Sequence, residues 1–296
     1  MANVTEVSTL QPRRGGGSAT IAGGVVSWAT RTGLARWSLA DRHDLPTVAT
    51  RPRMMAVAGH DGSAWLVTND QAAAAPELDQ IGPAGTLAAV APQPKLAAAT
   101  DFVAVTAREI FAADRSGLDV FGRASGERTH REAFKADEAA TCAALDDGVV
   151  FYQAGAVVRI GPGATRATYT VAGSPLHYAA GGDRDHLWAS HEGAVELLKL
   201  AAGAATVERT VAVPGVYRLA SVDGDAAVLS VAMKAGAWDK LTVTVVGTDG
   251  AIRWTKVLPA PAREFAEIAG GSGHVAVILD GVLHLLTAAD GAAVTP

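Results

Sequence analysis

Carboxylates recur at one kind of turn along this chain, where a short apolar segment reverses into a longer apolar run. The acids near these turns are Asp61, Asp101, Asp146, Asp147, Asp183, Asp185, Asp223 and Asp225. If the turns share one face of the fold, these carboxylates form an acidic rim that attracts a divalent cation or a basic peptide. We assign the rim first to four of them, Asp183, Asp185, Asp223 and Asp225. Ordinary turn chemistry is the alternative, because Asp tolerates tight turns and accepts hydrogen bonds from their backbone N–H groups.

Imidazole side chains could add to such a site. Three of the eight histidines, His60, His186 and His274, lie in or just after an inner turn. Three converging imidazoles could hold a metal ion, and the alternative is that they are ordinary turn or strand-start residues. No cofactor is predicted, although a divalent cation would suit the acidic turns.

Arginine and aromatic residues gather on the opposite set of connections, a composition enriched at protein-binding hot spots. The predicted partner-binding residues are Trp238, Arg263, Arg51, Arg53 and Tyr217. The segment KAGAWDK (234–240) reads as an insertion that carries Trp238 beyond the ends of its strands. The alternative for Tyr217 is that it begins a strand and is buried.

Motifs for enzyme chemistry are missing. The chain has no G-x-S-x-G, no P-loop and no dinucleotide-binding fingerprint. His191-Glu192 begins like a zinc-protease motif, but Val195 stands where the second histidine is required. No catalytic residue is therefore assigned.

A repeat of about 40 residues must position all of these side chains. Alanines that precede an acidic or glycine turn mark seven copies, at Ala22, Ala58, Ala98, Ala144, Ala180, Ala220 and Ala269. Each is followed by an apolar run rich in Val, Ile and aromatic residues, such as GVVSWAT or HLWASH, which is typical of a strand. A period of this length fits a four-stranded antiparallel sheet that stacks on its neighbours.

The sequence therefore predicts an all-β, seven-bladed β-propeller with four antiparallel strands per blade, spanning residues 1–296 as one domain. Residues 4–10 alternate like a strand that has no hairpin partner, while the last repeat is short. We expect this N-terminal strand to complete the last blade, which closes the ring and removes an open sheet edge.

Two segments carry a resemblance to known proteins. HLWASHEGAVELLKL (186–200) and VVGTDGAIRWTKV (245–257) resemble blades of the quinoprotein-like and related bacterial propeller families. The Gly-His and Trp-Asp pairs of WD-repeat blades are absent as a series. The resemblance implies a propeller in a bacterial protein, and propellers serve as scaffolds, lectins, lyases, lactonases and dehydrogenases, so it implies no single function.

Composition narrows the class of function. The net charge of −5 argues against general nucleic-acid binding, and no apolar run is long enough to span a membrane. The start of the chain lacks a signal-peptide pattern and Cys142 is the single cysteine, so a cytoplasmic location is expected. We predict a non-enzymatic scaffold that binds another protein across one propeller face, in a multi-subunit complex. The alternative is a small-ligand binder or a lyase- or hydrolase-type enzyme with a divalent metal at the channel mouth.

Overall fold

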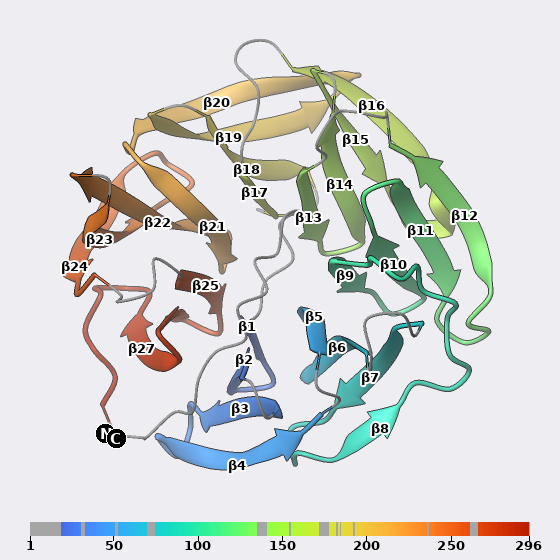
Figure 1. Cartoon of the computed structure of the whole chain (residues 1–296). Helices are drawn as coiled ribbons and strands as arrows, with labels where there is room; N and C mark the ends of the chain where they lie inside the picture. The colour runs from blue at the N-terminus through green and yellow to red at the C-terminus, as the bar shows by residue number, and fades with distance from the viewer. Residues whose placement is uncertain are drawn as a thin grey trace.

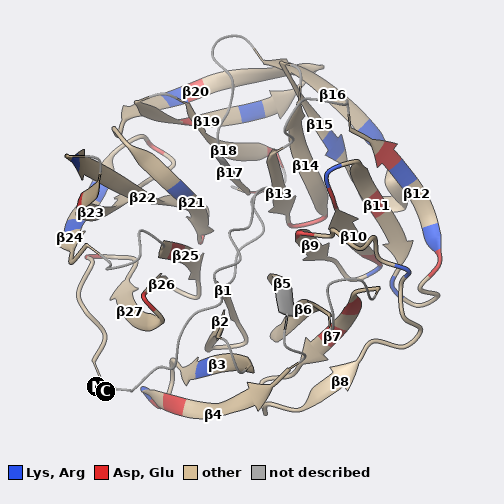
Figure 2. Cartoon of the chain, viewed as in Figure 1, with Lys and Arg blue, Asp and Glu red and all other residues tan. Residues whose placement is uncertain are grey.

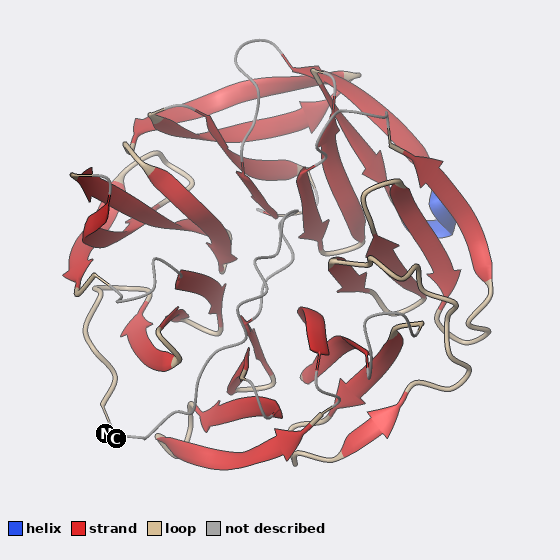
Figure 3. Ribbon diagram, in the orientation of Figure 1, coloured by secondary structure: helices blue, strands red, loops and turns tan. Residues whose placement is uncertain are grey.

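A computed structural model of the chain describes residues 19–295, apart from 31–32, 51–52, 70–74, 135–140, 154, 172–177, 182, 184, 192, 236 and 261–265. Strands make up almost all of its regular structure, and one short 3-10 helix, Pro162–Ala164, is present among the described residues (Figure 3). None of the helical structure in this part of the chain is long and apolar enough to cross a membrane. The predicted all-β class is confirmed.

Three four-stranded antiparallel sheets follow one another along the first half of the chain. The first contains β1 (Ala19–Ala22), β2 (Val25–Ala29), β3 (Gly33–Ser38) and β4 (His43–Ala49). The second contains β5 (Arg53–His60), β6 (Ser63–Asn69), β7 (Glu77–Ile81) and β8 (Leu87–Ala89). The third contains β9 (Phe102–Val105), β10 (Glu109–Ala113), β11 (Gly117–Gly122) and β12 (Arg128–Ala133).

An eight-stranded sheet comes next, in the order β13-β14-β15-β16-β20-β19-β18-β17. One half contains β13 (Thr141–Leu145), β14 (Gly148–Gln153), β15 (Ala156–Ile160) and β16 (Arg166–Val171). The other contains β17 (Tyr178–Gly181), β18 (His186–His191), β19 (Ala194–Ala201) and β20 (Ala204–Ala212). The halves join through β16 and β20, which pair in parallel at Thr170↔Ala204 and Val171↔Ala205. The sequence pattern did not predict this link.

The last two sheets complete a ring around a central opening (Figure 1). One contains β21 (Val216–Val222), β22 (Asp225–Lys234), β23 (Ala237–Val246) and β24 (Ile252–Leu258). The other contains β25 (Ala266–Gly271), β26 (His274–Leu279) and β27 (Val282–Thr287). The described residues thus form six hydrogen-bonded sheets.

Burial explains why the runs of Val, Ala and Trp become middle strands. All five residues of β2 are buried, whereas the outer strand β4 contains only exposed and half-buried residues. Apolar side chains from adjacent sheets interdigitate, as Phe111 of β10 and Phe151 of β14 do in one cluster. Charged residues of both signs mark the outer strand β12, a composition that discourages pairing with other chains (Figure 2).

One repeat anchor was misplaced by the sequence pattern. Ala98 lies outside any strand, and the inner strand of the third sheet is β9, Phe102–Val105. Asp101 therefore precedes that strand, at the opposite end from the turn that leads to β10. The error arose because LAAATD before β9 imitates the alanine-plus-acid signal of the true inner turns.

Inner strands of neighbouring sheets, and of the two halves of the eight-stranded sheet, approach so closely that glycine is required where they meet. A Cβ atom on Gly270 of β25 would lie 2.1 Å from the carbonyl oxygen of Ser221 on β21. A Cβ on Gly181 of β17 would lie 2.1 Å from the carbonyl oxygen of Ala144 on β13. These contacts fix the spacing of the sheets at the centre of the ring.

The C-terminal segment covers part of the outer edge of β27. Val294 N–H donates to the Leu285 carbonyl and Thr287 N–H to the Ala292 carbonyl, both at 2.9 Å. This pairing reaches Leu285–Thr287 and leaves the start of the strand, where Val282 is 45% exposed. The predicted N-terminal closing strand, residues 4–10, lies outside the described residues.

Candidate functional site

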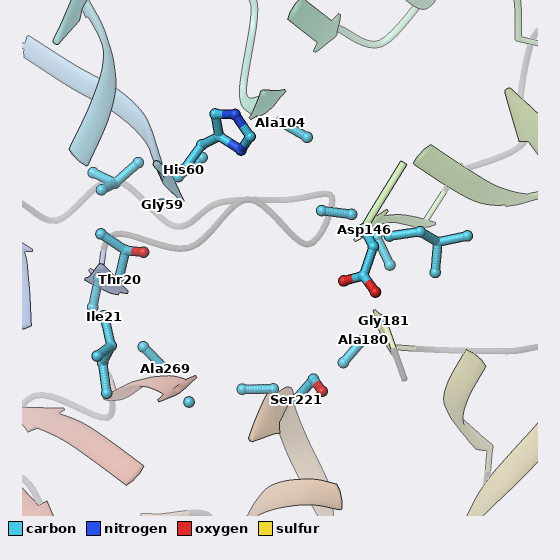
Figure 4. Close-up of a pocket in the computed structure, with 18 of the residues that line it drawn as sticks. Thr20, Ile21, Gly59, His60, Ala104, Asp146, Ala180, Gly181, Ser221 and Ala269 are labelled. Atoms are coloured by element: carbon cyan, nitrogen blue, oxygen red, sulfur yellow. The ribbon is translucent and has the colours of Figure 1, made fainter. Parts of the chain in front are cut away.

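A cavity of about 520 Å³ occupies the centre of the ring. Its wall is formed by the innermost strand of every sheet or half-sheet, namely β1, β5, β9, β13, β17, β21 and β25. Nearly half of the lining residues are alanine or glycine, whose small size leaves the space open (Figure 4). The volume lies within the range of small-molecule sites.

The acidic turns divide into two groups at this cavity. Asp183 and Asp223, from the predicted rim, line it together with Asp146, whereas Asp185 and Asp225 do not. Asp185 lies 3.6 Å from Arg159, and Asp225 accepts the Thr248 N–H at 3.1 Å. Only two of the four acids that were first assigned to the rim therefore line the cavity.

Turn chemistry occupies the carboxylates of Asp183 and Asp223. Asp183 Oδ1 accepts the backbone N–H groups of Asp185 and His186, at 2.8 and 2.9 Å, and lies 2.8 Å from His186 Nδ1. Asp223 Oδ2 accepts the Gly273 N–H at 2.7 Å. Burial alone would raise the pKa of Asp183, but the hydrogen bonds from Asp185 and His186 outweigh it, and the pKa lies below the ordinary 3.8.

We expect Asp183 to stabilise the fold as a turn cap rather than as a metal ligand. Because its folded pKa is lowered, its contribution is present above pH 4 and is lost as the pH falls through the folded pKa. Asp183→Ala should lower the melting temperature at neutral pH by about 2–4 °C, from one lost hydrogen-bond set worth about 1 kcal/mol. In Asp183→Asn the amide oxygen can still accept backbone hydrogen bonds of the turn. This variant should therefore lose less stability than the wild type when the pH is lowered.

Calcium provides the control for that experiment. Millimolar calcium should leave the melting temperature of the wild type unchanged, because backbone N–H groups already donate to these carboxylates, from its own turn for Asp183 and from Gly273 of the next sheet for Asp223. An increase with calcium that disappears when Asp183, Asp185, Asp223 and Asp225 are all changed to Asn would contradict the turn-cap explanation.

His60 is held at the cavity wall by a chain of contacts from two neighbouring sheets. Its Nε2 lies 2.8 Å from Asp61 Oδ2, and that oxygen accepts Arg123 at 3.0 Å. Arg123 also lies 4.9 Å from the centre of the Trp65 ring. Burial is the main cause that lowers the pKa of His60, so its imidazole is neutral at neutral pH.

The three histidines do not converge as the sequence suggested. His186 is flanked by Asp183 and by Glu208 at 3.4 Å, while His274 Nδ1 lies 2.6 Å from the Ser272 carbonyl. Within the part of the chain that the structure describes, no group of three or more His, Cys, Asp or Glu side chains could hold a metal ion.

On the opposite face, two of the predicted partner-binding residues meet. The rings of Tyr217 and Trp238 contact each other edge to face, with centroids 4.7 Å apart. Arg218 lies over the Tyr217 ring at 4.3 Å. Tyr217 and Trp238 also pack, partly buried, against the core shared by the last two sheets.

Trp238 lies within a strand and not beyond one, which corrects the sequence interpretation. The segment KAGAWDK belongs to the long hairpin of β22 and β23, where Trp238 pairs with Met233. The hairpin extends past its neighbours, since β21 pairs with β22 only up to Ser230 and β24 pairs with β23 only from Leu241. The residues that looked like an insertion are paired strand residues of this hairpin, and a short stretch of sequence does not show such pairing.

The other predicted partner-binding residues are only partly placed. Arg51 and Arg263 lie outside the described residues. Arg53 begins β5, where its backbone pairs with Asn69.

Sequence reasoning missed three residues that the structure brings to these sites. Met233 is 58% exposed at the tip of the hairpin, and Arg218 adjoins the aromatic pair. Thr20 lines the cavity beside β5. No local sequence signal identifies these residues, because their exposure and contacts depend on the pairing of distant strands.

Comparison with known proteins shows the fold. No protein-family model matches the chain, and no curated protein matches its sequence. Kluyveromyces lactis Hsv2 superposes with a TM-score of 0.65 at 10% identity, covering 90% of this chain and 91% of that one. The Myceliophteria thermophila Cps50 (Swd1) β-propeller domain superposes with a TM-score of 0.64 at 9% identity, covering 97% of this chain and 99% of that domain.

An enzyme has a similar structure as well. A catalytically inactive virginiamycin B lyase from Staphylococcus aureus, solved with quinupristin, gives a TM-score of 0.58 at 14% identity, covering 95% of this chain and 97% of the lyase. Similarities at these identities establish a β-propeller and carry no activity with them.

Proposed function

We propose that this chain, a β-propeller, serves as a non-enzymatic scaffold that binds a partner protein through the projecting β22–β23 hairpin. The ring itself we infer to have seven blades. Seven inner strands of the described chain line the central cavity, and the eight-stranded sheet divides into two blades at the short β16–β20 link. The N-terminal strand is proposed to complete the last blade beside the C-terminal segment.

The hairpin tip is the observation that carries the scaffold proposal. Met233 is directly opposite Trp238, so their side chains share one face of the hairpin. Tyr217 and Arg218 adjoin that face. Aromatic residues, Met and Arg are the types enriched in the buried centres of protein interfaces.

The polar surroundings suit the rim of such an interface. Lys234, Asp239 and Lys240 are exposed around the tip. Arg51, Arg53 and Arg263 are proposed to extend the rim along the same face. We further propose that the scaffold works in the cytoplasm of a bacterium, within a multi-subunit complex.

The test compares two exposed apolar residues on the same sheet. Met233→Asp should abolish recovery of one specific protein when the tagged chain is purified from its native cells. Val257→Asp, on β24, is the matched control, since Val257 is 53% exposed and Met233 is 58% exposed. With the purified pair, Met233→Asp should weaken binding by at least about tenfold, or roughly 1.4 kcal/mol.

Stability must be measured in parallel. Both variants should melt within about 2 °C of the wild type, because neither side chain is buried. Trp238→Ala is less suitable, since its packing against the core adds a stability cost that the sequence alone did not foresee. Equal recovery of the same proteins by Met233→Asp and Val257→Asp would rule out the hairpin as the interface.

A further inference from the structure

The central cavity contains polar groups that the scaffold proposal does not use. Asp146, in the turn between β13 and β14, lines the cavity, and its carboxylate points into the opening (Figure 4). Among the described residues it has neither an ion pair nor a hydrogen bond, unlike the other acids of the inner turns. Its neighbour Asp147, for example, binds Arg159 at 2.7 Å.

Thr20 faces Asp146 across the opening. Its side chain is on β1, and its hydroxyl is directed toward the cavity from the other wall (Figure 4). Thr20 is only 9% exposed, and no hydrogen bond is made to its hydroxyl within the described part of the chain. The hydroxyl of this nearly buried residue is open to the cavity, so its hydrogen-bonding capacity points to a ligand or to ordered water there.

The rest of the wall defines what could fill the space. Alanine side chains such as Ala58, Ala104 and Ala269 line it, so a ligand's carbon atoms would meet small apolar groups. His60, whose pKa is lowered mainly by burial, adds an imidazole whose Nε2 lies 2.8 Å from Asp61 Oδ2. A carboxylate, a hydroxyl and a neutral imidazole all accept hydrogen bonds.

We propose that this cavity binds a small organic ammonium ion that carries a second hydrogen-bonding group. The ammonium pairs with Asp146, the second group bonds to the Thr20 hydroxyl, and the carbon chain lies against the alanines. Charge selects the ligand, since Asp183 and Asp223 at the same mouth repel anions. The ammonium can belong to a free amine or to a lysine side chain of a peptide.

Calorimetric titration near neutral pH tests the proposal on the full chain. Aminobutanol and diaminobutane are the probes, butanediol and succinate are the uncharged and anionic controls, and N-acetyllysine amide represents a peptide lysine. The amines should bind at millimolar concentration or tighter, and the two controls should not bind. Tighter binding of the lysine amide than of either free amine would assign the site to a peptide and still support it.

Variants then locate the site. Asp146→Asn should weaken amine binding by about tenfold or more. Asp185→Asn changes the net charge equally in a neighbouring turn, but Asp185 does not line the cavity, so binding should be retained. Thr20→Val should weaken the binding of aminobutanol by a smaller factor than Asp146→Asn does. Melting curves should show that the Thr20→Val variant is folded.

Two results would overturn the proposal. The first is that no amine binds the wild type at millimolar concentration. The second is that Asp185→Asn weakens binding as much as Asp146→Asn, because that would make the effect one of overall charge. Neither result would affect the hairpin interface, which Met233→Asp tests separately.

Discussion

Deletion of residues 288–296 should lower the melting temperature of this protein by about 10 °C. The deleted turn accepts a hydrogen bond from Trp254 Nε1 at Ala288, at 2.7 Å, and one from Lys256 Nζ at Gly291, at 2.8 Å. Further bonds pair the segment with β27, among them Thr287 N–H to the Ala292 carbonyl and Val294 N–H to the Leu285 carbonyl. Four bonds at about 1 kcal/mol each, with about 2–4 °C per kcal/mol in a chain of this size, give that estimate.

The N-terminal strand provides the matching experiment. Deletion of residues 1–12 should also lower the melting temperature by several degrees, because the start of β27 is left as an open edge that residues 4–10 are proposed to fill. If this variant melts like the wild type while the 288–296 deletion does not, the C-terminal segment alone closes the ring. Unchanged melting of the 288–296 deletion would contradict the contribution of the Trp254 and Lys256 contacts.

Gly270→Ala should destabilise the ring by about 2–3 kcal/mol, which corresponds to a fall of roughly 5–10 °C in melting temperature. The added Cβ would sit 2.1 Å from the Ser221 carbonyl oxygen, so β21 and β25 must move apart. Gly181→Ala should act in the same way against Ala144. The cost is steric, because backbone atoms cannot rotate aside as a flexible side chain can.

Gly82→Ala is the matched control. A Cβ at Gly82 would meet no atom within 4 Å, so its melting temperature should stay within about 1 °C of the wild type or rise slightly. Thermal melts of the three variants measure the difference. If Gly270→Ala melts like Gly82→Ala, the inner strands are not held at the spacing that the fold requires.

Local pattern was enough to predict many of the strands and the tighter hairpins. VVFYQAGAVVRI became β14 and β15, and HLWASH became β18, because alternation and β-branched residues act within a few residues of each other. The ring followed from the period of the repeat, since each sheet must bury its faces against the next.

Tertiary structure alone decided which side chains are available for function. The sequence could not tell which of eight similar acids has a free carboxylate. The fold satisfies Asp183 and Asp223 through turn backbones, whereas Asp146 has no hydrogen bond or ion pair within the described part of the chain. Trp238 read as an exposed insertion until strand pairing placed it in β23 against Tyr217. The physical reason is that hydrogen bonds and packing between segments distant in sequence determine burial and pairing, and a local window contains neither.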